Sequence, residues 1–190
     1  MTDKEHEGAL AISNSSERLV GFLEETGLHK KDFAEMIGVT LSYVYSLIDN
    51  TIAFSTRITT LERIAVVMDI EPEDYPEYKI SEEPKIIDPG IQFLKEKQHE
   101  KGFSNLDFIK KFPRNRRVEI VDLWRGALPL PLDWNYLYSI AQILGISPEE
   151  IYPYWQLRMR QYFMSGGIDL ISNAHLADAM FNGAKSYLKI

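Results

Sequence analysis

The densest group of cationic side chains in the sequence lies between residues 110 and 125. Six basic residues there stand against two acidic ones, Glu119 and Asp122, for a net charge of +4; the six are Lys110, Lys111, Arg114, Arg116, Arg117 and Arg125. Guanidinium and ammonium groups at this density hold phosphate by charge and by hydrogen bonds. Two interpretations are open, a solvated charged surface and a surface that contacts phosphate groups.

Groupings of side chains that indicate catalysis or metal binding do not emerge from the sequence. The histidines are scattered, and no two of them have the helical spacing of metal ligands; they are His6, His29, His99 and His175. The adjacent glutamate pairs, such as Glu24-Glu25, diverge on a helix and are poor acid–base partners. There is no cysteine, which excludes disulfides, thiolate zinc sites and thiol catalysis. We therefore expect no enzyme activity, no metal and no cofactor.

The composition indicates a soluble protein. Of 190 residues, 45% are hydrophobic and 12% aromatic, so the chain has the material for a packed core. The first residues are polar and carry no signal-peptide core, and no apolar stretch approaches the length of a membrane span. We expect a cytoplasmic location and no membrane contact. The net charge of −7 means that any surface for a polyanion must concentrate its cations on one face.

The hydrophobic periodicity is helical almost throughout and predicts an all-α fold. Ser15 and Ser16 are possible N-caps of a first helix that ends at Gly27. Further helices are expected over 30–37, over 40–48, from Thr59 or Thr60, and near Pro72–Tyr75. Residues 1–14 are predicted to be a flexible arm, and 79–90, with two prolines and a glycine, a linker.

The second half of the sequence repeats the first. With a shift of 76, residues 42–78 align with 118–154 without a gap, so that Leu47 matches Leu123 and Leu61 matches Leu137. The shared positions are mostly inward-facing at helical spacing, so the repeat conserves a core. We expect two tandem five-helix units, at 15–78 and 91–154, followed by C-terminal helices over 155–190.

The stretch from Leu28 to Asn50 resembles the helix-turn-helix of lambda-repressor-like (XRE, Cro) transcriptional regulators. Ala34 is small where two helices cross closely, and Gly38 supplies the left-handed turn between them. Val39, Val44 and Leu47 bury the back of the second helix. The segments 60–65 and 68–74 resemble the family's fourth and fifth helices. The resemblance covers 15–78 closely and 91–154 more weakly, where Pro113-Arg114 replaces the turn glycine.

The resemblance implies a sequence-specific regulator that reads double-stranded DNA with the helix over 40–48 in the major groove. It places Thr40, Leu41, Ser42 and Ser46 near base edges, and Tyr43 and Tyr45 near the backbone or an adjacent base. The remaining candidates for DNA contact are Lys30, Lys31, Asn50, Arg57, Arg114, Arg116 and Arg117, of which Arg116 and Arg117 match Thr40 and Leu41 in the repeat.

An alternative class of function is a protein-interaction module on the same scaffold. Residues 15–80 carry 6 basic and 12 acidic side chains, a net charge of −6. The presumed reading helix also has no Arg, Lys, Asn or Gln before Asn50, so the strongest bidentate base contacts are absent. Either feature favours a protein partner in place of DNA.

The last helix carries a narrow apolar seam. Its residues recur at alternating spacings of four and three: Leu170, Ala174, Ala177, Phe181, Ala184 and Leu188. Such a seam either covers the protein's own core or joins two copies of the chain, so a homodimer is a further expectation.

Overall fold

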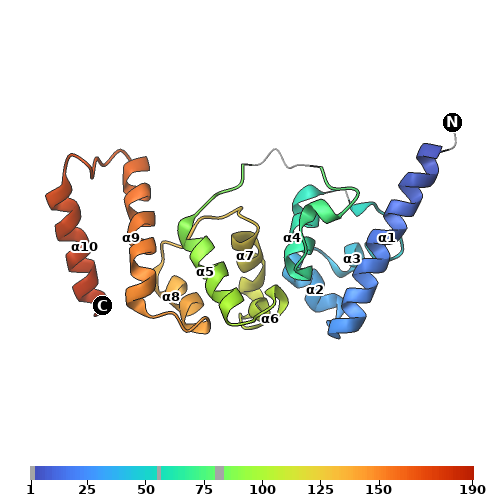
Figure 1. Ribbon diagram of the computed structural model, residues 1–190, viewed down its shortest axis with the longest axis horizontal. Helices are drawn as coiled ribbons and strands as arrows, with labels where there is room; N and C mark the ends of the chain where they lie inside the picture. The colour runs from blue at the N-terminus through green and yellow to red at the C-terminus, as the bar shows by residue number, and fades with distance from the viewer. Residues whose placement is uncertain (1–2, 55–56, 80–83) are drawn as a thin grey trace. The chain divides into compact units, whose positions relative to one another are not determined.

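The computed structural model describes residues 3–54, 57–79 and 84–190, and the side chains from residue 15 onward (Figure 1). These residues form ten α-helices and no strand, which confirms the all-α fold class. The helices divide into two compact units. Unit 1 comprises Met1–Ile86 and Phe103–Leu128, and unit 2 comprises Ile87–Gly102 and Pro129–Ile190. Each unit is therefore built from two separate stretches of chain.

Unit 1 contains α1 (Asp3–Thr26), α2 (Lys30–Ile37), α3 (Leu41–Ile48), α4 (Ile58–Met68), the 3-10 turn η2 (Pro72–Asp74), α6 (Asn105–Lys110) and α7 (Arg114–Trp124). Helix α2 packs against α3, α4 and α7, and α4 also packs against α6. The core of the unit includes side chains with no solvent-exposed surface, among them Phe33, Leu47, Leu61, Phe108 and Ile120. Deep burial of these side chains is the main stabilising contribution to the unit.

Unit 2 contains α5 (Pro89–Glu100), α8 (Trp134–Ile143), α9 (Pro148–Ser165) and α10 (Ala174–Leu188). The carboxylate of Asp88 caps α5 by accepting from the backbone N–H of Gly90, and it also accepts from Leu130. Ser147 and Glu150 form a capping box at the start of α9. Helix α9 ends at Ser165, before Gly166 and Gly167, and α10 runs back beside it (Figure 1).

The grouping of helices differs from the ranges expected from the repeat. Helices α6 and α7, which belong to the second copy in sequence, cluster with α1–α4 in unit 1. The compact units therefore differ in extent from 15–78 and 91–154, and the arrangement as two tandem five-helix units is not confirmed.

Two expected helix starts are wrong. Helix α1 begins at Asp3, so Ser15 and Ser16 are buried inside it and cap nothing, and the backbone of 3–14 is helical where an arm was expected. Ser15 donates to the carboxylate of Glu77, and Ser16 donates to the Leu47 carbonyl. Helix α4 begins at Ile58 after Arg57, one residue before Thr59. In α1, tertiary hydrogen bonds of Ser15 and Ser16 outweigh their local capping preference. Of the predicted arm and linker, residues 1–2 and 80–83 lie outside the described residues.

Candidate nucleic-acid interface

The turn between α2 and α3 fixes how these helices cross. Gly38 ends α2 in the left-handed region, at φ 70° and ψ 38°, as the sequence predicted. The backbone N–H of Val39 then donates to the Ala34 carbonyl at 3.0 Å, which satisfies a carbonyl at the helix end. Thr40 follows in an extended conformation and caps α3 by accepting from the N–H of Tyr43 at 3.2 Å. A three-residue connection, Gly38 to Thr40, thus joins two helices of eight residues each.

Helix α3 has a fully buried back and an exposed front. Val44 and Leu47 have no solvent-exposed surface. On the front, Thr40, Leu41, Ser42 and Tyr45 are exposed, while Tyr43 and Ser46 are half-buried. The first two turns of α3 therefore present hydroxyl groups and one leucine to the surface of unit 1.

Two cationic side chains lie over tyrosine rings of this surface. The Lys30 ammonium lies 4.9 Å from the centroid of the Tyr45 ring, and the Arg57 guanidinium lies 5.7 Å from that of Tyr43. These are cation–π distances. Burial raises the pKa of Tyr43 above its ordinary value, and the charge of Arg57 offsets part of that rise. Lys31 is exposed beside Lys30. Lys30 thus lies over Tyr45, and Arg57 lies over Tyr43.

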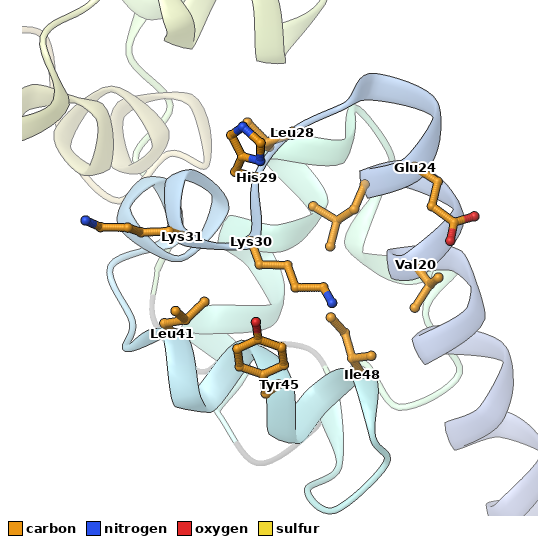
Figure 2. A pocket seen from close by; sticks show the side chains of 10 residues that line it. Val20, Glu24, Leu28, His29, Lys30, Lys31, Leu41, Tyr45 and Ile48 are labelled. Atoms are coloured by element: carbon orange, nitrogen blue, oxygen red, sulfur yellow. The ribbon is translucent and has the colours of Figure 1, made fainter.

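A groove with a volume of about 510 Å³ opens along this surface between α1, α2 and α3. Its apolar lining includes Val20, Leu41 and Ile48, and Lys30 extends across it over Tyr45 toward Ile48 (Figure 2). Lys31 points away from Lys30 at the edge of the groove (Figure 2). The groove therefore has an apolar floor, with Lys30 lying across it and Lys31 at its edge.

Asn50 has a structural place in unit 1. It adopts the left-handed conformation expected for it, with φ 54°. Its side-chain oxygen lies 2.6 Å from the Ser16 hydroxyl, which shares its one hydrogen between this oxygen and the Leu47 carbonyl and so ties the end of α3 to α1. Part of the hydrogen-bonding capacity of Asn50 is therefore used within the fold.

The arginines at the start of α7 contact groups within unit 1. Arg114 reaches α2, where its guanidinium lies 2.7 Å from Asp32 and 3.6 Å from Glu35. Arg116 pairs with Glu119 at 2.8 Å, and Arg117 donates to the Phe112 carbonyl at 3.1 Å. Arg114 is thereby placed next to α2, whereas Glu119 and Phe112 belong to the same segment as Arg116 and Arg117.

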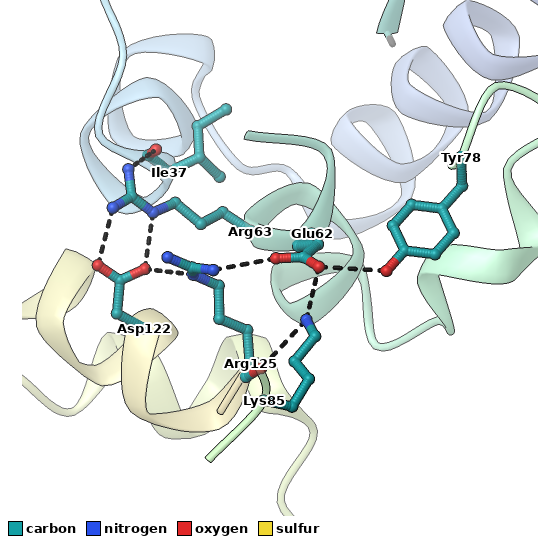
Figure 3. Close-up of polar contacts among 7 residues, drawn as sticks. All are labelled: Ile37, Glu62, Arg63, Tyr78, Lys85, Asp122 and Arg125. Atoms are coloured by element: carbon teal, nitrogen blue, oxygen red, sulfur yellow. Dashed lines mark hydrogen bonds and ion pairs between the residues drawn. The ribbon is translucent and has the colours of Figure 1, made fainter. Parts of the chain in front are cut away.

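A network of charged groups that the sequence analysis did not single out joins α4, α7 and residue 85 (Figure 3). The carboxylate of Glu62, 1% exposed, accepts from Arg125 at 2.9 Å, Lys85 at 2.5 Å and Tyr78 at 3.1 Å. Arg63 and Asp122 form a bidentate pair at 2.8 and 2.7 Å, and Arg63 also donates to the Ile37 carbonyl. Arg125, which pairs with Glu62, also donates to Asp122 at 2.7 Å and so connects the Glu62 contacts to the Arg63–Asp122 pair. The network positions the helix that carries Arg114.

The pKa of Asp122 lies below its ordinary value of about 3.9. Burial alone would raise this pKa, but hydrogen bonds from Arg63 and Arg125 and their positive charges outweigh the burial. A carboxylate with a lowered pKa in the folded state stabilises the fold above its unfolded pKa, and this contribution is lost as pH falls through the folded pKa.

Asp122→Asn is therefore expected to reduce the stability of unit 1 by about 2 kcal/mol at pH 7. The difference from the unaltered chain should stay constant above about pH 5 and shrink as pH falls below about 4. Urea denaturation at a series of pH values measures it. The exposed Asp74, changed to asparagine, is the control and should alter stability by less than about 0.5 kcal/mol. A difference that is independent of pH contradicts the assignment.

Comparisons with known proteins add no relative to this picture. No protein-family model matches the sequence, and neither the curated proteins nor the solved structures gave a match. In the described part of the chain, no helix is both long and apolar enough to cross a bilayer. Nor does any group of three or more His, Cys, Asp or Glu side chains there have an arrangement suited to a metal ion.

Proposed function

We propose that unit 1 binds double-stranded DNA through α2 and α3, and that the chain is a sequence-specific transcriptional regulator. The observation that carries the proposal is the exposed front of α3, with Thr40, Leu41 and Ser42 at its start, between the cations Lys30 and Arg57. Eight residues make a helix of about 12 Å, a length that fits within the major groove.

The chemistry of α3 indicates how it would read bases. The hydroxyls of Thr40 and Ser42 donate or accept toward base edges, and Leu41 suits the methyl group of thymine. Because α3 has no arginine or lysine, affinity would come mostly from phosphate contacts at its borders. Arg114 supports these contacts by neutralising Asp32 and Glu35, which would otherwise repel phosphate next to Lys30 and Lys31.

The test begins with selection of DNA from a random pool, followed by titration of the enriched sequence. Lys30→Ala is expected to weaken binding roughly five- to tenfold near 100 mM salt, because one phosphate contact is lost. The slope of log affinity against log salt should fall by about 1. Fluorescence anisotropy at several salt concentrations measures both quantities.

Lys79→Ala is the matched control, since Lys79 is an exposed lysine of unit 1 outside α2 and α3. Its removal should change binding much less than that of Lys30. Equal losses in the two variants, or no enrichment and no binding of any DNA at low salt, would refute the proposed function.

A second candidate function is binding of a protein partner at the same surface. The apolar floor of the groove and the net charge of −6 over residues 15–80 favour it. Affinity purification that recovers a stoichiometric protein and no nucleic acid supports this candidate. Leu41→Glu, in the groove lining, should then abolish the recovery.

A further inference from the structure

The seam that the sequence suggested for dimerisation is used within the chain. Ala177 is fully buried and Phe181 is 5% exposed, because α10 packs on α9. The Tyr152 hydroxyl donates to the Phe181 carbonyl at 2.6 Å, and the Arg160 guanidinium lies 5.0 Å from the Phe181 ring. Of the two interpretations of this seam, cover for the protein's own core is the one that the contacts favour.

A second apolar face of α10 is left open to solvent. Leu176, Met180 and Tyr187 are 44%, 36% and 86% exposed, and with Gly183 they recur at spacings of four, three and four. Eight of the thirteen exposed large hydrophobic residues in the described chain lie between Leu157 and Tyr187. An exposed apolar concentration of this kind indicates an interaction surface.

The composition of this face favours a second copy of the chain over other occupants. The charged residues of α10, Asp178 and Lys185, lie on the opposite side of the helix at 3.6 residues per turn. Two copies would therefore meet without repulsion between like charges. An anionic membrane surface attracts basic helices, whereas this face has no cation and the chain has a net charge of −7.

The shape of the face is also self-complementary, as a two-fold contact requires. In an antiparallel pair of α10 helices, the two-fold symmetry axis that relates the two copies would pass between residues 181 and 182. Leu176 of one copy then lies opposite Tyr187 of the other, and Met180 lies opposite Gly183. Apart from the two chain neighbours and the backbone of α10 itself, no described atom lies within 4 Å of a Cβ built on Gly183, so there is room for the methionine. Large residues thus meet at both ends and a large residue meets a small one near the centre.

We infer that the chain forms a homodimer through this face of α10, with Met180 of each copy seated over Gly183 of the other. A helix of 15 residues is about 22 Å long, so the contact is small among specific interfaces. We expect weak association, with a dissociation constant on the order of micromolar. The inference does not depend on DNA binding by unit 1.

The test is analytical ultracentrifugation of the full chain over roughly 1 to 200 µM, which brackets the expected affinity. The 21.9 kDa chain should approach twice its mass at the upper end. Met180→Glu should raise the dissociation constant on the order of tenfold or more, because it places two carboxylates at the centre of the interface. Ile87→Glu, at a residue 79% exposed elsewhere in unit 2, is the control and should leave it unchanged.

Gly183→Leu separates shape-specific association from general stickiness. The added side chain increases the apolar surface, so non-specific association would become stronger. In the proposed pair it occupies the position of the partner's Met180, so the dimer should weaken at least tenfold while circular dichroism shows an intact fold. The inference is overturned if the chain is a monomer at 200 µM, or if it is a monomer that binds lipid vesicles. It is also overturned if Met180→Glu leaves the dimer intact, or if Gly183→Leu makes the dimer stronger.

Discussion

Replacing Glu62 by glutamine is expected to destabilise unit 1 by about 3 kcal/mol. The carboxylate is 1% exposed and holds the side chains of Arg125 and Lys85. Glutamine has nearly the same size and still accepts hydrogen bonds, but it removes the buried negative charge that faces Arg125 and Lys85, and Arg125 is left with the carboxylate of Asp122. Loss of a charge interaction at the buried guanidinium of Arg125 costs more than loss of a neutral hydrogen bond. Urea denaturation followed by circular dichroism measures the change.

Hydrogen–deuterium exchange locates the effect. Peptides from α4 and α7 should exchange faster in Glu62→Gln, because Glu62 joins these helices through Arg125. The control is Glu73→Gln, a glutamate that is exposed on η2. Removing both partners, with Arg125→Met added to Glu62→Gln, should cost less than the sum of the single changes. Strict additivity would indicate that the pair contributes no coupling energy.

The elements that could be predicted from the sequence are those fixed by local rules. The bounds of α2 follow from the periodicity of Phe33, Ala34 and Ile37 and from the glycine that ends the helix. Gly38 and Asn50 adopt the left-handed conformations that their residue types favour. The exposed front of α3 follows in turn, because burial of Val44 and Leu47 directs the intervening residues outward.

What could not be predicted depends on contacts between distant segments. Glu62 and Arg125 are separated by 63 positions, so nothing in the sequence near either residue indicates the pair. The same holds for Arg114, whose ion pair with Asp32 depends on α7 packing against α2. The repeat indicates that the cores of the two copies are alike. It does not determine which helices pack together, and α6 and α7 join unit 1.

Gly38→Val is expected to reduce stability by about 3 kcal/mol and to weaken any DNA binding by unit 1. A β-branched residue at φ 70° is strained by about 1–2 kcal/mol. A Cβ at this position would also lie 2.9 Å from Nη1 of Arg63 and 3.4 Å from a methyl carbon of Val118. Arg63 has little freedom to move, because Asp122 holds its guanidinium in a bidentate pair. Thermal unfolding measures the loss of stability.

Gly27→Val isolates the contribution of these contacts. Gly27 has nearly the same backbone conformation, with φ 61°, but no other described atom lies within 4 Å of its Cβ position. Its substitution should carry the backbone strain alone, roughly half of the cost at Gly38. If the two substitutions cost the same, Arg63 and Val118 yield freely and the turn is not held by α4 and α7. If Gly38→Val costs more, the network around Asp122 supports the turn that orients α3, and any DNA affinity should fall with it.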